Sequence, residues 1–288
     1  MPDGVGMLDL ASWVAKAPAD KKNFREAVHI ILAAIGASTV LRGNMILKGG
    51  MLMALRYDSS RFTRDADFST TAKYAKGDEQ KLLEELGVQL DLANAVSSYD
   101  TFCQIQRHSL TPPGPNKSFP TLALNIGYAS RSNVRALQRL LAGQSPTVVE
   151  IDYSYNEAVL HAEMLRLTDG DGLKVYSLVN LMAEKFRSLL QQPVRNRYRR
   201  QDVYDLWLLT SEVQDWTLAD RQALRDCIIA SAQSRGLRAE RLSLRDPQVI
   251  HMAAVGYLDM QAEIDGPLPK FDAIYHSVQG FYENLPWI

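Results

Sequence analysis

Residues 48–69, KGGMLMALRYDSSRFTRDADFS, are the most informative part of the chain. Gly49 and Gly50 stand between a short apolar run and a segment with helical apolar spacing. A Gly-Gly turn lets the backbone approach a phosphate closely, and the first turn of the following helix offers free N–H groups to an anion. Lys48, Gly49 and Gly50 are therefore our candidate nucleotide-binding turn.

The end of the same stretch carries two carboxylates, Asp65 and Asp67, in a short β-like run. Alternate residues of a strand project from the same face, so we expect these two side chains to point together. Two carboxylates so close repel each other unless a cation lies between them, and Mg²⁺ typically takes one or two carboxylates plus substrate phosphates. Asp-x-Asp and Gly-Gly are each common, but their combination predicts a metal–nucleoside triphosphate site for two-metal phosphoryl or nucleotidyl transfer.

A third carboxylate is expected from a neighbouring strand. The run TVVEIDY, residues 147–153, places Glu150 and Asp152 on one face. Asp152 is the favoured metal ligand because its shorter arm suits an ion held about 2.1 Å from a rigid strand. The alternative is that both acids belong to the polar outer face of an edge strand.

A further group of candidates lies in helical sequence. Lys185 has apolar helical neighbours and could reach a triphosphate as a point charge, or it could be a surface lysine that extends its amine to water. Arg187 and the arginines of residues 195–200 form a local basic cluster, which indicates either a phosphate or RNA contact or a solvated loop. Asp202 opens the next helix with Asp205 one turn later, where the helix dipole alone favours acids.

The pattern of elements predicts an α+β fold. Alternating, strand-like runs occupy residues 101–107, 121–128 and 147–153, after helical patterns at 8–17, 21–38 and 78–95. From about residue 177 onward only helical patterns appear, at residues 177–191, 200–211, 217–234, 247–263 and 269–284. We therefore expect a catalytic core with N-terminal helices over residues 1–170 and a helical domain over residues 171–288.

Composition narrows the class of protein. The 288 residues are 46% hydrophobic and 23% charged with a net charge of −1, so any nucleic-acid contact must come from a local basic patch. The cysteines, Cys103 and Cys227, form neither a zinc spacing nor a disulfide framework. No apolar run reaches the roughly 18 residues of a membrane span, and the start of the chain lacks the pattern of a signal peptide. We expect a cytoplasmic protein without a membrane partner.

Two blocks of this sequence resemble a known family. Lys48-Gly49-Gly50, followed by Arg61-Phe-Thr63-Arg-Asp65-Ala-Asp67-Phe, resembles the first motifs of the AbiEii/AbiGii-type nucleotidyltransferase toxins, which belong to the DNA polymerase β-like nucleotidyltransferase superfamily. Ala183-Glu-Lys185, the arginine-rich loop and Gln201-Asp202-Val-Tyr-Asp205-Leu resemble that family's later motifs. The resemblance extends over roughly residues 25–210.

The resemblance implies a nucleotidyltransferase-type mixed β-sheet core flanked by helices, with a helical C-terminal domain that contributes Lys185 and Asp202 to the site. It implies Mg²⁺-dependent transfer of NMP from an NTP to an acceptor, with RNA at tRNA 3′ ends the acceptor in several members. The chain would then be the toxin of a toxin–antitoxin or phage-defence system with a cognate antitoxin. Asp65 and Asp67 would match the metal ligands, Lys185 the triphosphate-binding lysine and Asp202 a later essential acid.

Three positions qualify this resemblance. Thr63 falls where some relatives are controlled by phosphorylation, and a phosphate there would add negative charge beside the metal-binding acids. Gln201 replaces the usual Arg or Lys before the acid, and Met51 replaces a small hydroxyl residue after the glycines. Two other functions stay open: a nucleotidyltransferase that modifies a protein or small molecule, and a catalytically idle module that binds a nucleotide or a partner.

Overall fold

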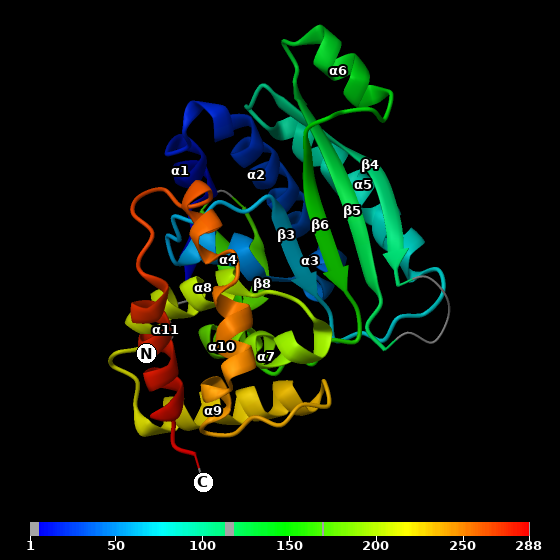
Figure 1. Ribbon diagram of the computed structural model, residues 1–288. Helices are drawn as coiled ribbons and strands as arrows, with labels where there is room; N and C mark the ends of the chain where they lie inside the picture. Colours follow the sequence, from blue (N-terminus) through cyan, green and yellow to red (C-terminus); the bar gives the residue numbers. More distant parts are fainter. Residues whose placement is uncertain (1–5, 113–117, 169, 288) are drawn as a thin grey trace. The chain divides into compact units, whose positions relative to one another are not determined.

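The computed structural model describes residues 6–112, 118–168 and 170–287 (Figure 1). The chain divides into two compact units. The first contains the described part of Met1–Arg56 together with Thr63–Val175, and the second contains Tyr57–Phe62 and the chain from Tyr176 onward. The chain therefore passes into the second unit for six residues before β3 and then returns.

The first unit is built on a mixed sheet, which within the described residues has eight strands in the order β1-β7-β8-β2-β3-β6-β5-β4. β2 and β3 are antiparallel, β3 and β6 are parallel, and β5 pairs antiparallel with both β4 and β6. β2 and β3 therefore lie in the interior of the sheet, with paired strands on both sides. The strands are β1 (Met7–Leu8), β2 (Ile46–Lys48), β3 (Asp65–Ser69), β4 (Thr101–Thr111), β5 (Thr121–Ser130), β6 (Val148–Ser154), β7 (Ala162–Leu167) and β8 (Gly172–Tyr176).

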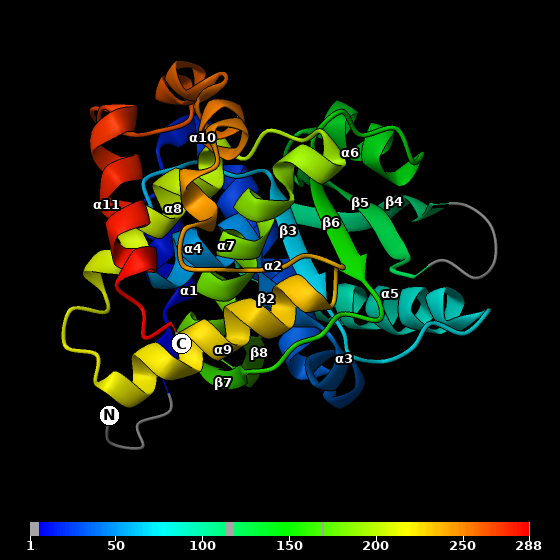
Figure 2. The same ribbon diagram turned by 60° about the horizontal axis from the view of Figure 1, so that its bottom comes forward.

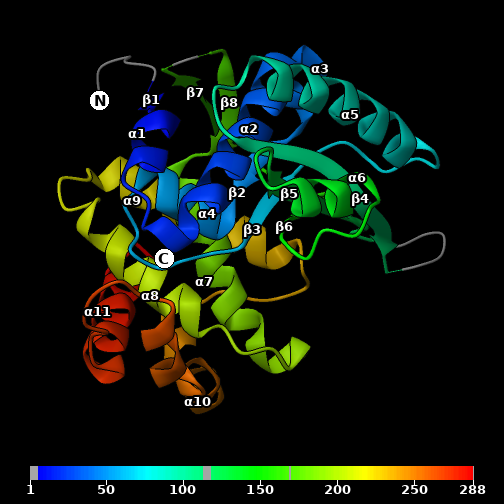
Figure 3. The same cartoon turned by 90° about the horizontal axis from the view of Figure 1, so that it is seen from above.

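Helices pack on this sheet through apolar faces. α2 buries Ile31, Leu32 and Ile35. It contacts strands β4, β5 and β6 and the neighbouring helix α5, so part of the core lies between these helices and the sheet (Figure 3). Each fully buried side chain of this kind contributes about 1.5–3 kcal/mol. α6 contacts β4 and β5, and α4 contacts β2 and β3. The helices are α1 (Leu10–Ala15), α2 (Lys22–Ala37), α3 (Thr39–Asn44), α4 (Gly49–Arg56), α5 (Asp78–Val96) and α6 (Val134–Leu141), with a 3-10 turn at Ala19–Lys21.

The second unit is helical (Figure 2). α7 is its centre and contacts α8, α9 and α10, while α11 contacts α8. Its elements are α7 (Leu178–Arg195), α8 (Arg200–Ser211), α9 (Leu218–Gln233), α10 (Pro247–Ala254) and α11 (Phe271–Glu283), with 3-10 helices at Ser243–Arg245 and Tyr257–Ala262. The predicted α+β fold, a mixed sheet flanked by helices and followed by helices alone, is confirmed.

Two predicted helices differ in detail. The helix expected over residues 247–263 is interrupted after Ala254, because Gly256 adopts a φ of +69° that an α-helix cannot contain. The helix expected to end at residue 191 continues to Arg195 through Pro193. Among the described residues, none of the helices is long and apolar enough to span a bilayer.

Gln192 explains why the helix tolerates Pro193. Proline has no N–H to donate to the carbonyl four residues earlier. The fully buried Gln192 amide donates instead to that carbonyl, of Leu189, at 3.1 Å, and to the carbonyl of Val249 at 3.3 Å. Its oxygen accepts from the backbone N–H of Arg199 at 2.8 Å. One side chain thus joins α7, α10 and the loop before α8.

Residues 57–62, which we call the strap, are bound to the second unit by several contacts. The Phe62 N–H donates to the Glu263 carbonyl at 2.7 Å, and the Asp265 N–H donates to the Ser60 carbonyl at 3.2 Å. Arg61 and Ile264 form an antiparallel bridge between these bonds. The strap therefore behaves as a short strand added to the helical unit.

Replacing Gln192 should destabilise the protein. In Gln192→Leu, the carbonyl of Val249 and the N–H of Arg199 lose their buried partner, at a cost of about 1–3 kcal/mol for each group left unsatisfied. Urea unfolding should therefore show a clear loss, whereas Gln248→Leu, at an exposed position on α10, should change the free energy of unfolding by under about 0.5 kcal/mol. Equal effects of the two substitutions would refute the role given to Gln192.

Candidate functional site

The turn between β2 and α4 is formed by glycines for two reasons. α4 begins at Gly49, whose φ of +68° lies in the region that other residues avoid. A Cβ atom at this position would also overlap the carboxylate of Asp67. Lys48 is paired with Asp67 across β2 and β3, so the two side chains project from the same face. The structure therefore brings the predicted turn directly against one of the predicted metal ligands.

Four acidic residues share that face of the sheet. In the parallel pairing of β3 with β6, Asp65 is opposite Glu150 and Asp67 is opposite Asp152. Neighbouring strands lie about 4.8 Å apart, so each acid has another acid directly opposite it on the neighbouring strand. The alternating residues Ala66 and Phe68 are buried in the core on the other face, which fixes the register that exposes the acids.

The mutual repulsion of these acids is visible in the pKa of Asp152. Partial removal of its carboxylate from water, followed by the charges of Asp65 and Glu150, raises this pKa above its ordinary value. Lys48 opposes the shift.

These residues fit a divalent cation. Asp65, Asp67 and Asp152 supply hard oxygen donors from rigid interior strands, and their repulsion is what a cation would relieve. Among the described residues, no group of three or more His, Cys, Asp or Glu side chains is placed so that the protein alone could hold a metal ion. An open arrangement suits Mg²⁺, which keeps several waters and shares its shell with substrate phosphates. Glu150 and Asp152 are the two candidates for a third ligand. Asp152 is paired with Asp67 across β3 and β6, and the charge of Lys48 acts on its pKa, so Asp152 is the candidate nearer the glycine turn.

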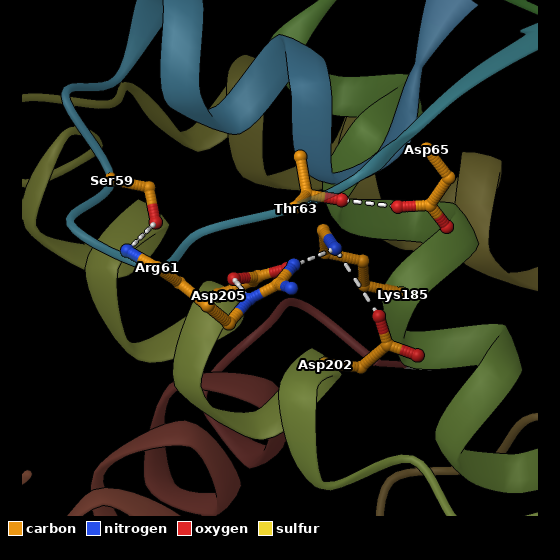
Figure 4. Close-up of polar contacts among 7 residues, drawn as sticks. All are labelled: Ser59, Arg61, Thr63, Asp65, Lys185, Asp202 and Asp205. Carbon is orange, nitrogen blue, oxygen red and sulfur yellow. Dashed lines mark hydrogen bonds and ion pairs between the residues drawn. The ribbon is translucent and has the colours of Figure 1, made fainter. Parts of the chain in front are cut away.

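Thr63 is held against the same acids. Its side chain is buried, and its hydroxyl donates a hydrogen bond to Oδ1 of Asp65 (Figure 4). The threonine therefore fixes the orientation of one carboxylate, and any group added to its oxygen would replace that hydrogen bond.

The second unit contains a separate charged group, the lysine cluster, made of Arg61, Lys185, Asp202 and Asp205 (Figure 4). Nζ of Lys185 lies 2.6 Å from Oδ2 of Asp205 and 3.2 Å from Oδ1 of Asp202. Arg61 of the strap donates to both oxygens of Asp205, through Nη2 at 3.0 Å and Nε at 3.2 Å. Two cations and two anions from the strap, α7 and α8 thus meet at one point.

Because the cluster is buried, the charge of each of its residues depends strongly on the charges of the others. Asp205 is completely buried and Lys185 is 6% exposed. Burial alone would raise the pKa of Asp205, but the charges of Lys185 and Arg61 hold that pKa below its ordinary value. Burial likewise works against the charge of Lys185, but Asp205 and Asp202 raise the pKa of its amine. All three groups therefore stay ionised because each one has its partners.

The remaining oxygen of Asp202 is not used by this network. Oδ2 is buried and has no hydrogen-bond partner among the described residues. A buried carboxylate oxygen without a donor costs free energy, so it is available to accept from a ligand or an ordered water. Arg187, a predicted nucleotide contact, is instead occupied on its own helix by Glu184 at 3.0 Å and Gln191 at 2.8 Å.

Sequence reasoning missed two members of the cluster. The sequence presents Arg61 and Asp205 only as parts of motifs, and the helix dipole alone is enough to explain an acid at position 205. The available signal was the spacing of Asp202 and Asp205, which places both acids on one face of α8. The contact of Arg61 with Asp205 joins residues 144 positions apart, and no local pattern indicates it.

Comparison with known proteins identifies a family for the chain and related folds. The profile of the family described as "Nucleotidyl transferase AbiEii toxin, Type IV TA system" matches residues 30–277. The fold is similar to that of a candidate nucleotidyltransferase from Helicobacter pylori, with a TM-score of 0.50, 12% identity and coverage of 93% of this chain and 96% of the other. JHP933 from Helicobacter pylori gives a TM-score of 0.55 at 13% identity, with 94% and 93% covered. No curated protein matches the sequence.

Substituting Asp205 should destabilise the second unit and change its response to acid. Asp205→Asn leaves Lys185 and Arg61 buried with only Asp202 to balance them, which should cost about 3–5 kcal/mol. Because the folded-state pKa of Asp205 is depressed, its stabilisation is complete above the unfolded pKa of about 3.9 and is lost as the pH falls further. Urea titrations between pH 3 and 7 should show that the free energy of unfolding of the wild type falls at the acidic end, which we call the acid limb. The acid limb should be smaller in Asp205→Asn.

Asp215→Asn is the matched control, because Asp215 is exposed in the same unit. It should leave both the stability at neutral pH and the acid limb unchanged. A wild-type-like acid limb in Asp205→Asn would contradict the assignment.

Substitutions at two glycines should change the stability of the protein in opposite directions. Gly49→Ala forces a non-glycine residue to positive φ and into the Asp67 carboxylate, so it should destabilise by at least about 1–3 kcal/mol. Gly87→Ala, inside α5 and facing open space, should stabilise by about 0.8–1.0 kcal/mol. Urea midpoints measure both, and a neutral Gly49→Ala would show that the turn is not constrained as described.

Proposed function

Because the chain belongs to the AbiEii family of nucleotidyltransferase toxins of type IV toxin–antitoxin systems, we propose that it transfers NMP from an NTP to an RNA acceptor, at the 3′ end of tRNA. The observation that carries this proposal is the contact of the Gly49 turn with the Asp67 carboxylate on interior strands. A phosphate-binding backbone turn beside a metal-binding acid is the arrangement that a metal–triphosphate complex needs.

In this proposal, the turn binds the triphosphate. The backbone N–H groups of Gly49 and Gly50 at the start of α4 face the β- and γ-phosphates, and Lys48 adds a positive charge. Met51, which replaces the small hydroxyl residue of relatives, is fully buried. Phosphate contacts in the turn therefore come from backbone groups, which a side-chain change at position 51 leaves intact.

Asp65, Asp67 and Asp152 would hold Mg²⁺. When bound, Mg²⁺ would neutralise triphosphate charge and favour the deprotonated form of the attacking hydroxyl. In the reaction, an RNA hydroxyl oxygen bonds to the α-phosphorus, the bond from that phosphorus to the bridging oxygen breaks, pyrophosphate leaves and the proton passes to solvent. The protein's own contribution is to hold the carboxylates in register, which the β3–β6 pairing and Thr63 achieve.

Lys185 and Asp202 are proposed to serve the same nucleotide. Lys185 supplies a positive charge to the triphosphate, and Asp202 and Asp205 fix its amine. Arg61, bound to Asp205, precedes Asp65 by only four residues in the chain. The strap therefore ties the lysine cluster covalently to the strand that carries the metal-binding acids.

Control by a cognate antitoxin is proposed to act on Thr63. A phosphoryl group on its hydroxyl would replace the hydrogen bond to Asp65 and add about −1.5 to −2 charges beside acids that already repel one another. Binding of Mg²⁺–NTP would become unfavourable for both steric and electrostatic reasons. NTPs and RNA are cytoplasmic, so the proposal places the reaction in the cytoplasm.

Label transfer tests the proposed reaction. The protein is incubated with Mg²⁺, total tRNA and each α-³²P-NTP in turn. One NTP should label RNA, and Asp67→Asn should lower the rate by about 100-fold or more, because charge stabilisation of this kind contributes at least that much. Asp91→Asn, which removes an exposed acid from α5, should keep full activity.

The other outcomes separate the alternatives. Label on a protein or on a small molecule would keep the nucleotidyltransferase and overturn the RNA acceptor. No label anywhere, together with no binding of Mg²⁺–NTP by calorimetry, would overturn the enzyme and leave an idle binding module.

A further inference from the structure

We propose that the loop joining α7 to α8, the arginine loop (residues 195–200), binds the backbone and one unstacked base of a single-stranded RNA end. The inference rests on the proposed function for the identity of the acceptor. Its own evidence is the charge, the exposure and the fixed backbone of the loop.

Three of the four arginines of the arginine loop have no acidic partner among the described residues. Its sequence, RNRYRR, has four arginines in six positions within a chain of net charge −1. Arg195 and Arg197 are exposed, and within the described part of the chain neither they nor Arg199 forms an ion pair, whereas Arg200 lies 4.0 Å from Glu263. Several other arginines of the second unit are paired, as Arg61 is with Asp205 and Arg245 with Glu283. Uncompensated arginines are suited to phosphate, which they bind through a planar fork of donors.

An aromatic side chain lies among these charges. Tyr198 is 51% exposed, between Arg197 and Arg199, and within the described part of the chain it has no ring contact. An exposed ring between arginines can stack on an unstacked base, and the same nucleotide brings phosphates to the arginines. Stacking of one base on an aromatic side chain contributes about 1–3 kcal/mol. The ring selects single-stranded nucleic acid over an acidic protein surface, which would use the arginines alone.

The backbone of the arginine loop is held in one conformation. Asn196 ends α7 in the left-handed region with a φ of 49°, and its N–H donates to the Gln192 carbonyl. The same carbonyl accepts from the N–H of Arg197 at 3.3 Å, and the Gln192 side chain accepts from the N–H of Arg199 at 2.8 Å. A fixed backbone reduces the entropy lost on binding, so exposed arginines here bind more tightly than on a mobile loop.

The arginine loop also leads directly into the lysine cluster. The N–H of Asp202 donates to the carbonyl of Arg199 at 3.0 Å, and Asp202 contacts Lys185. Arg199 is therefore within one helical turn of Asp202, one of the groups proposed to bind the triphosphate. This is the position required of an element that delivers the acceptor end.

Direct binding tests the inference without catalysis. Fluorescence anisotropy follows a labelled single-stranded oligoribonucleotide of mixed sequence, in EDTA and without NTP, at several salt concentrations. Arg195→Gln/Arg197→Gln should weaken binding at least about tenfold and lower the slope of log K against log salt by about 1.4, since each phosphate contact contributes about 0.7 for single strands. Tyr198→Leu should weaken binding without changing the slope, because stacking releases no counterions.

Arg135→Gln/Arg139→Gln is the matched control. It removes two exposed arginines from α6, where no aromatic residue separates them, and should bind RNA as the wild type does. The affinity for Mg²⁺–NTP, measured by calorimetry, should be unchanged in the Arg195/Arg197 and Tyr198 variants. This result would show that the variants are folded.

The results separate this inference from the proposed function. RNA binding that depends on the arginine loop, without label transfer, would support the inference and overturn the reaction. Wild-type RNA affinity in Arg195→Gln/Arg197→Gln, or an equal loss in the α6 control, would overturn the inference whatever the label transfer shows. Competition by polyglutamate as effective as by RNA would assign the loop to an acidic protein and also overturn it.

Discussion

The second unit depends on one buried carboxylate. Asp205 is fully buried and balances the charges of both Lys185 and Arg61, which come from α7 and from the strap. A charge in such a place is tolerated only with its partners, so three distant segments must meet for any one of them to be stable. The strap therefore belongs to the helical unit even though it lies between α4 and β3 of the sheet. The same network holds the Lys185 amine charged and oriented, which is what a group that binds phosphate requires.

The first unit solves a different electrostatic problem. Its acids are on one face of interior strands, opposite the buried Ala66 and Phe68, and partial burial together with the charges of Asp65 and Glu150 raises the pKa of Asp152. The glycine turn is adjacent because Gly49 leaves room for the Asp67 carboxylate. One side of the site thus groups acids suited to a cation, and the turn begins a helix, whose first N–H groups are suited to phosphate. A metal–triphosphate complex satisfies both requirements together, and membership of the AbiEii family is consistent with that chemistry.

Local sequence patterns predict the type and position of many helices and strands. The elements that they do not predict depend on contacts between distant residues. The alternation around Asp65 and Asp67 predicted their shared face because strand periodicity is local, and β3 has this register. β7 and β8 were not predicted, because each is short and β8 gains its place by pairing with β2, more than a hundred residues earlier. The extension of α7 past Pro193 depends on a side-chain bond of Gln192, which helix propensity does not describe. The strap contacts and the role of Asp205 were not predicted because they join residues far apart in the sequence. The strap forms backbone hydrogen bonds with residues 263 and 265, and Asp205 forms an ion pair with Arg61.

We propose that the acids of β3 and the lysine cluster bind one triphosphate. The decisive measurement is a double-mutant cycle on the affinity for a non-hydrolysable Mg²⁺–NTP analogue, determined by calorimetry with Asp67→Asn, Lys185→Met and the double variant. Both single variants should weaken binding, and their effects should be non-additive by more than about 0.5 kcal/mol, as expected for groups that share a ligand. Additive effects, or wild-type affinity in Lys185→Met, would contradict it.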